Sequence, residues 1–177
     1  MSTNRLSRSL ACALLLSFPA VPCIANAATP DPVAKELASE VKRVGVDEFT
    51  AADYKPGTVR HVVLVRFRAG LTDTARQQII TKFLALQQQS VRNGKPYIES
   101  IDTGPQLSGE GASHGMQQAF IVTFSSQGDR NYFIGTPIVT DPHHYEPAHA
   151  AFKEIFKPAL APDGLIGFDF AVAPSAQ

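Results

Sequence analysis

The chain has 177 residues, with 16 basic and 16 acidic side chains and a hydrophobic fraction of 44%. This length suits one ordinary domain, and the even charge balance excludes the strongly basic surface that nucleic acids or anionic membranes require. Both cysteines, Cys12 and Cys23, precede residue 28, so a mature chain that begins there has no thiol for a disulfide, a zinc site or cysteine catalysis.

The first 27 residues have the pattern of a secretory signal peptide. Arg5 and Arg8 precede an apolar run from Leu10 to Val21, and Ala25-Asn26-Ala27 supplies the small residues at which signal peptidase cuts. The apolar run is shorter than the roughly 20 residues that span a bilayer. We therefore expect cleavage after Ala27, no membrane anchor in the mature chain, and a periplasmic or secreted protein.

Residues 28–58 are expected to form an arm in front of the domain. Val33, Leu37 and Val41 recur at near-helical spacing before Gly45, which predicts one short amphipathic helix. The stretch that follows, up to Gly57, is typical of a linker. The sequence leaves open whether this arm packs on the domain or on a partner.

The first half of the domain alternates between strand and helix signals. The β-branched run 59–67 predicts a strand, and apolar residues on one face of 72–91 predict a long helix. A weaker strand at 97–101 then runs into a Gly/Ser-rich loop at 104–115, which precedes a clear strand at 118–124.

The second half continues with less regular signals. Residues 130–134 are compatible with one helical turn, 136–145 are rich in proline, 147–160 predict a second helix, 165–172 predict the last strand, and 173–177 form a tail. The element order β-α-β-β-α-β over residues 59–172 predicts an α+β, ferredoxin-like protomer with an antiparallel sheet.

The strands are apolar on both faces, although two helices can cover only one. Val62 and Leu64 oppose Val63 and Val65 in the first strand, and the third and last strands repeat this pattern. A large apolar sheet face is rarely left in water, so a second copy of the same sheet is the simplest cover. The alternative is that the arm at 28–58 folds over its own sheet.

Four segments in this order resemble the stress-responsive A/B barrel domain (Dabb) family, whose members are dimeric α/β barrels. They are RHVVLVRFRAG, AFIVTFSS, PAHAAFKEIFKP and LIGFDF, and the resemblance covers residues 59–172. It implies a homodimer formed by sheet-to-sheet packing. Members of this family differ in function, from heat-stable stress proteins to olivetolic acid cyclase, so the resemblance does not fix the activity.

A distant resemblance to olivetolic acid cyclase also implies candidate site residues. The histidine that acts there as a base matches His149, and a histidine lining the pocket matches His61. A further pocket histidine is replaced by Gln118, and the family's HPxH motif begins with Glu146 here. The partner tyrosine has no clean counterpart, so Tyr132 and Tyr145 both remain candidates.

The residues themselves favour an inward-facing histidine pair. His149 shares a helical stripe with Phe152 and Phe156, and His61 alternates with Val63 in the first strand. Two imidazoles beside an apolar cleft can serve as a general base and an orienting donor. The alternative is that both are hydrogen-bonded core residues. The candidate ligand-binding residues are His61, Gln118, His149 and Phe152.

The stretch DPHHYEPAH offers weak metal-ligand candidates at Asp141, His143, His144, Glu146 and His149, but its spacing matches no known metal signature. There is no glycine-rich phosphate loop and no G-x-S-x-G motif, so no cofactor is expected.

Three classes of function remain open. The leading hypothesis is an exported homodimer that binds a small apolar or aromatic molecule between sheet and helices. The second is a cofactor-free cyclase or lyase, or a monooxygenase-like enzyme, that uses His149 as base. The third is a structural stress-protective protein without a ligand.

Overall fold

A computed structural model describes residues 31–173, and the predicted signal peptide and residues 174–177 lie outside this range. Within it, no helix has both the length and the apolar character needed to cross a bilayer. The helices are α1 (Pro32–Val44), α2 (Val46–Phe49), α3 (Asp73–Gln89), α4 (Gln127–Ile134) and α5 (Pro147–Phe156), with 3-10 turns at Pro142–His144 and Lys157–Ala159. The strands are β1 (Pro56–Phe67), β2 (Val91–Arg92), β3 (Lys95–Pro96), β4 (Ile98–Pro105), β5 (Gln118–Ser126) and β6 (Leu160–Ala171).

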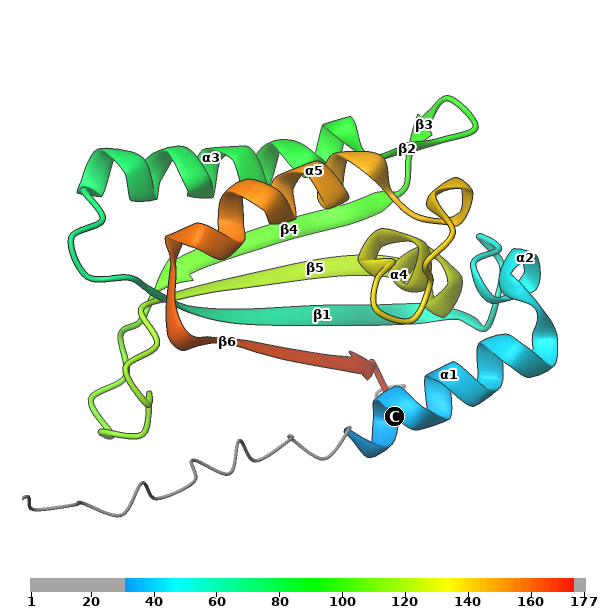
Figure 1. Cartoon of the computed structure of the whole chain (residues 1–177), viewed down its shortest axis with the longest axis horizontal. Coiled ribbons are helices and arrows are strands. Elements are labelled where there is room, and N and C mark those ends of the chain that lie inside the picture. Colours follow the sequence, from blue (N-terminus) through cyan, green and yellow to red (C-terminus); the bar gives the residue numbers. More distant parts are fainter. Residues whose placement is uncertain (1–30, 174–177) are drawn as a thin grey trace, which may run out of the picture. The chain divides into compact units, whose positions relative to one another are not determined.

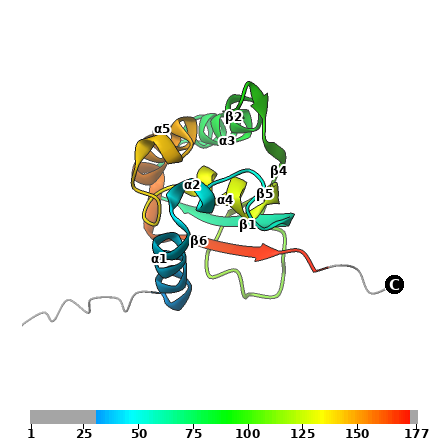
Figure 2. The same ribbon diagram turned by 90° about the vertical axis from the view of Figure 1, so that its right-hand side faces the viewer.

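Four strands form one antiparallel sheet in the order β4-β5-β1-β6. The central strand β1 pairs with β5 on one side and with β6 on the other. Helices α3 and α5 lie side by side over one face of this sheet (Figures 1 and 2). This arrangement confirms the predicted ferredoxin-like α+β fold.

Side-chain caps set where the helices begin. The Thr72 hydroxyl accepts a hydrogen bond from the Ala75 amide at the start of α3, and the Glu146 carboxylate accepts one from Ala148 at the start of α5. Pro147 occupies the first position of α5, where its missing amide hydrogen is not needed. The Glu146 cap and Pro147 fix the end of α5 that carries His149.

The main core fills the space between the sheet and the two long helices. It contains phenylalanines that are at most 6% exposed, and its aromatic rings pack against one another across the layers. Its members are Val63, Val65, Phe67, Ile79, Phe83, Leu86, Ile98, Ile101, Phe120, Val122, Phe124, Phe133, Phe152, Phe156 and Ala159.

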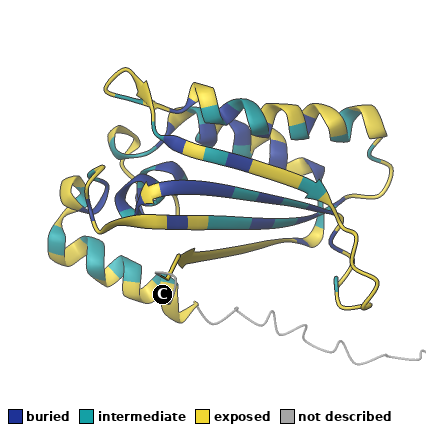
Figure 3. Cartoon of the chain, turned by 180° about the vertical axis from the view of Figure 1, so that it is seen from behind, coloured by how far each residue is buried: buried dark blue, intermediate teal, exposed yellow. Residues whose placement is uncertain are grey.

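The opposite face of the sheet is apolar and partly open. Cross-strand pairing places Val62 beside Ile121 and Phe168, and Leu64 beside Ile166. Phe168 is 63% exposed and Ile166 is 40% exposed. Figure 3 shows β6 as exposed along most of its length. The strands therefore have the two apolar faces that the sequence predicts, and only one is covered by α3 and α5.

The N-terminal arm packs on the domain through α2 and α4. Phe49 and Tyr54 form a second buried cluster with Val139. The Asn131 side chain donates a 2.8 Å hydrogen bond to the Phe49 carbonyl. The arm thus lies against its own domain, which the sequence left open. Its position also argues against the alternative in which it covers the open sheet face, because Phe168 remains exposed.

Several element boundaries differ from the sequence predictions. α4 is a two-turn helix over 127–134 rather than one turn at 130–134, and β4 continues to Pro105. α5 ends at Phe156, because Pro158 cannot continue the helical hydrogen bonding, and β6 begins at residue 160 rather than 165. The early start of β6 brings Leu160 alongside Phe67 of β1.

Candidate functional site

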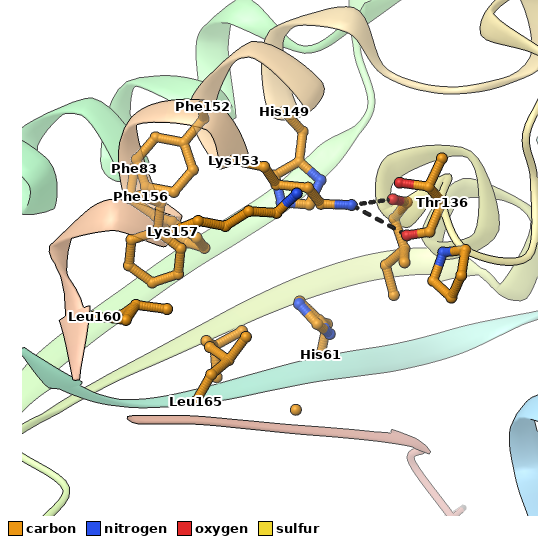
Figure 4. A pocket seen from close by; sticks show the side chains of 14 residues that line it. His61, Phe83, Thr136, His149, Phe152, Lys153, Phe156, Lys157, Leu160 and Leu165 are labelled. Atoms are coloured by element: carbon orange, nitrogen blue, oxygen red, sulfur yellow. Dashed lines mark hydrogen bonds between the residues drawn. The ribbon is translucent and has the colours of Figure 1, made fainter. Parts of the chain in front are cut away.

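A cavity of about 420 Å³ lies beneath α5, between that helix and strands β1 and β6. Its wall is mostly apolar, and Phe83, Phe152, Phe156 and Leu165 contribute to it (Figure 4). His61, His149 and Lys153 are among its few polar lining residues. The volume lies within the range typical of sites for small molecules.

His61 is oriented by a carboxylate on the neighbouring strand. Antiparallel pairing places Asp169 of β6 directly opposite His61 of β1. The distance from His61 Nδ1 to Asp169 Oδ1 is 2.5 Å, and the carboxylate can only accept, so Nδ1 carries the proton. The Nε2 atom of a neutral His61 is therefore left with a free lone pair.

Arg130 completes this arrangement behind Asp169. Arg130 Nη1 lies 3.5 Å from Asp169 Oδ2, and the Arg130 side chain is largely buried. Burial lowers the pKa of Arg130, and the charge of Asp169 acts in the opposite direction. The guanidinium thus places a positive charge behind the carboxylate that orients His61.

His149 is held in a different way. Its Nδ1 atom donates a 2.6 Å hydrogen bond to the Phe133 carbonyl, and its ring stacks on the Phe133 ring with centroids 3.9 Å apart. Burial lowers the pKa of His149 to about 3, with a smaller contribution from the charge of Lys153. His149 is therefore a neutral imidazole that offers Nε2 as a hydrogen-bond acceptor.

Lys153 lies one turn after His149 on α5. Its ammonium group donates hydrogen bonds to the Ile134 carbonyl at 2.5 Å and to the Thr136 carbonyl at 3.3 Å (Figure 4). Burial lowers the pKa of Lys153, and the charge of Lys157 adds to this effect. The cavity thus contains a half-buried amine as well as two imidazoles.

The cavity brings together three of the four predicted ligand-binding residues. His61, His149 and Phe152 line it, as the strand alternation and the helical stripe indicated. Gln118 does not line it, because its side chain donates a 2.7 Å hydrogen bond to Thr103 of β4. Gln118 shares the helix-covered face of β5 with Phe120, but this hydrogen bond holds its side chain at the outer strand β4.

Neither predicted tyrosine lines the cavity. The Tyr132 ring lies 4.4 Å from the Arg92 guanidinium and packs edge-on against Tyr97. Tyr145 packs beside the arm, next to Gly135, whose missing side chain leaves room for its ring. The structure therefore gives the histidines no tyrosine partner among the residues that line this cavity.

The weak metal-ligand candidates are directed to separate partners. Glu146 accepts a hydrogen bond from the Tyr97 hydroxyl and caps α5, while His144 lies 3.5 Å from Asp47 of the arm. Within residues 31–173, no three potential ligand side chains converge on one point. His143 is another of these candidates, and its backbone amide donates a hydrogen bond to the Asp141 carboxylate.

Sequence reasoning missed Asp169, Arg130 and Lys153. Asp169 shares a strand face with Leu165 and could have been placed on the helix side by alternation alone. Its pairing with His61 depends on the register between the first and last strands, which no local pattern provides. Lys153 follows His149 by one helical turn, which was a usable signal.

Comparisons with known proteins agree with this architecture. Residues 59–172 match the family described as Stress responsive A/B Barrel Domain. No curated protein matches the chain.

Three solved structures show the same fold. A hydroxynitrile lyase from Passiflora edulis gives a TM-score of 0.54 at 22% identity, over 69% of this chain and 99% of that chain. A protein from Arabidopsis thaliana gives a TM-score of 0.51 at 21% identity, over 67% of this chain and 99% of that chain. A dimeric ferredoxin-like protein of unknown function from Jannaschia sp. CCS1 gives a TM-score of 0.52 at 15% identity, over 66% of this chain and 100% of that chain. At these identities the likeness shows the fold alone.

Proposed function

The chain belongs to the stress responsive A/B barrel domain family, and we propose that it binds a small, largely apolar or aromatic molecule in the cavity beneath α5. The single observation that carries the proposal is the composition of that cavity, which combines an apolar wall with a few converging polar groups. A cavity of about 420 Å³ also disfavours a purely structural stress-protective role, because such a role needs no internal space.

A cavity-filling variant tests this proposal. Gly167 lines the cavity, and a Cβ atom added there would meet no other atom within 4 Å. The substitution Gly167→Leu should therefore fill the cavity without straining the strand. Binding of small aromatic alcohols, aldehydes and acids, measured by saturation-transfer NMR, should be lost in this variant, with its melting temperature retained.

Gly104→Leu is the matched control. Gly104 also lies in a strand of the sheet and has free space where a side chain would extend, but it does not line the cavity. This variant should bind the same compounds as the unaltered protein. Equal binding by Gly167→Leu would show that the compounds lie elsewhere and would refute the proposal.

We also propose a second function for the same cavity, cofactor-free proton transfer, because of the contact between His61 and Asp169. His61 Nε2 takes a proton from a hydroxyl or an activated C–H group of the bound molecule, and Asp169 stabilises the imidazolium that forms. This assigns the base to His61 rather than to His149, since burial makes His149 a weak base. His149 Nε2 then accepts a hydrogen bond that positions the substrate.

Exchange of a ligand C–H hydrogen for deuterium, followed by NMR, tests this chemistry. Asp169→Asn should slow the exchange by about a hundredfold or more, because the amide no longer stabilises the imidazolium. Ligand affinity should change little. Asp163→Asn, at an exposed position in the irregularly paired part of β6 before Leu165, is the matched control. If His149→Asn abolishes exchange and Asp169→Asn does not, then His61 is not the base.

The proposed assembly is a homodimer formed by the open sheet face. The exposed residues Ile166, Phe168 and Phe170 support it, as does the description of the Jannaschia neighbour as dimeric. Export to the periplasm or medium is likewise a proposal, and it is based on residues 1–27. N-terminal sequencing of the mature protein should begin at Ala28.

A further inference from the structure

Two lysines line the cavity, and no acid lines it with them among residues 31–173. Lys153 and Lys157 lie one helical turn apart at the α5 end of the wall. Like charges at this spacing repel each other. Lys157 lies 3.7 Å from Glu154, but both side chains are well exposed, so this pair contributes little.

Lys153 also has no carboxylate partner in the part of the chain that the structure describes. Its contacts with the Ile134 and Thr136 carbonyls use two of its three N–H groups. These carbonyls lie at and just beyond the C-terminal end of α4, where a cation is favourable. That helix-capping role explains the two hydrogen bonds. It does not explain a half-buried cation, next to a second lysine, in an otherwise apolar cavity.

The polar groups gather toward one end of the cavity, where the apolar residues Ile134 and Pro137 adjoin Thr136. Figure 4 shows His149, Lys153 and Thr136 toward one end, with Leu160 and Leu165 toward the other. His61 points into the space below Lys153. A ligand that matches this distribution has a polar head and an apolar body.

We infer that the molecule bound in this cavity is an apolar or aromatic monocarboxylate, whose carboxylate pairs with Lys153 and Lys157. This inference rests on the binding function proposed above and adds the chemical class of the ligand. A carboxylate supplies the missing counter-charge and accepts the remaining N–H of Lys153. A phosphate is less suitable, because no arginine of the described part of the chain lines the cavity to provide the bidentate contacts that such groups favour.

Titration calorimetry with phenylacetate and its neutral analogue phenylacetamide tests this inference. The unaltered protein should bind phenylacetate about tenfold more tightly than the amide. Lys153→Met should remove this preference, and Lys153→Arg should restore part of it. Lys95→Met, at an exposed site in the β2–β3 hairpin, should leave both affinities unchanged.

Lys157→Met provides a second variant in case Lys153→Met loosens the end of α4. The Lys157 side chain is well exposed and pairs with the exposed Glu154, so its loss should reduce the preference for phenylacetate without affecting the fold. Equal affinity for the two compounds, or tighter binding of phenyl phosphate, would overturn the inference but leave the binding proposal intact. Failure of every compound to bind would overturn both.

Discussion

His149 is the residue whose chemistry departs most from that of a free side chain. In an unfolded chain its pKa is near 6.5, whereas burial lowers the pKa of His149 to about 3 in the folded protein. Between these values the unfolded state binds more protons, so stability rises with pH. We predict that the free energy of unfolding falls by about 1.4 kcal/mol per pH unit on acidification below pH 6.5 because of this residue.

Denaturant titrations between about pH 5 and pH 7 measure this effect, because most carboxylates are already ionised in that range. His149→Asn keeps a donor for the Phe133 carbonyl but cannot be protonated, so this variant should show a flatter dependence on pH. His114→Asn is the control, because His114 is exposed. An unchanged slope in His149→Asn would show that His149 is not the buried neutral imidazole described above.

Part of the site was predictable from local patterns, and part was not. The helical stripe through His149 and Phe152 and the alternation through His61 both follow from the geometry of one element, and all three residues line the cavity. Asp169 and Arg130 reach His61 only through strand pairing and the packing of α4. Such contacts depend on the assembled fold, so sequence reasoning did not provide them.

At the scale of elements, α4 shows why polar sequences are hard to interpret. Its residues Gly128, Asp129 and Asn131 suggest an exposed turn, yet all three are buried. Each is buried because the arm or the β2–β3 hairpin supplies a partner. Asp129 pairs with Arg92 at 2.7 Å, and Asn131 donates to the Phe49 carbonyl. Helix 127–134 is therefore stabilised by contacts that its own sequence does not contain.

Gly128 lies at a close approach between the arm and α4. A Cβ atom at this position would lie 1.7 Å from the Ala51 carbonyl oxygen, and the Gly128 amide donates to the Tyr54 carbonyl. We predict that Gly128→Ala lowers the free energy of unfolding by about 2 kcal/mol or more. Because the clash is with the arm, hydrogen exchange should accelerate mainly in residues 46–54.

Gly109→Ala is the matched control for this variant. Gly109 lies in the exposed loop before β5, and a Cβ atom added there would meet no other atom within 4 Å. Its replacement by alanine should leave both stability and hydrogen exchange of the arm unchanged. If the amide hydrogens of residues 46–54 exchange as slowly in Gly128→Ala as in the unaltered protein, the arm does not pack on α4 as described.

At the scale of the whole molecule, the sheet was predictable because its strands are short β-branched runs that are apolar on both faces. The open face carries Val62, Leu64 and Ile121 beside the more exposed Ile166 and Phe168. One chain does not bury this face, since its arm packs beside α4 instead. The same property that identifies the strands therefore predicts the assembly.

Phe168→Glu tests the assembly directly. Each copy of a homodimer would then bury a carboxylate in an apolar interface, where desolvation of an unpaired charge costs several kcal/mol. We predict a dimer for the unaltered protein and a monomer for this variant in sedimentation velocity. Leu107→Glu is the control, because Leu107 is 88% exposed in the loop that precedes β5. Since the cavity lies on the other face of the sheet, the monomeric Phe168→Glu variant should keep its ligand affinity. An unaltered protein that stays monomeric at high concentration would contradict the proposed interface.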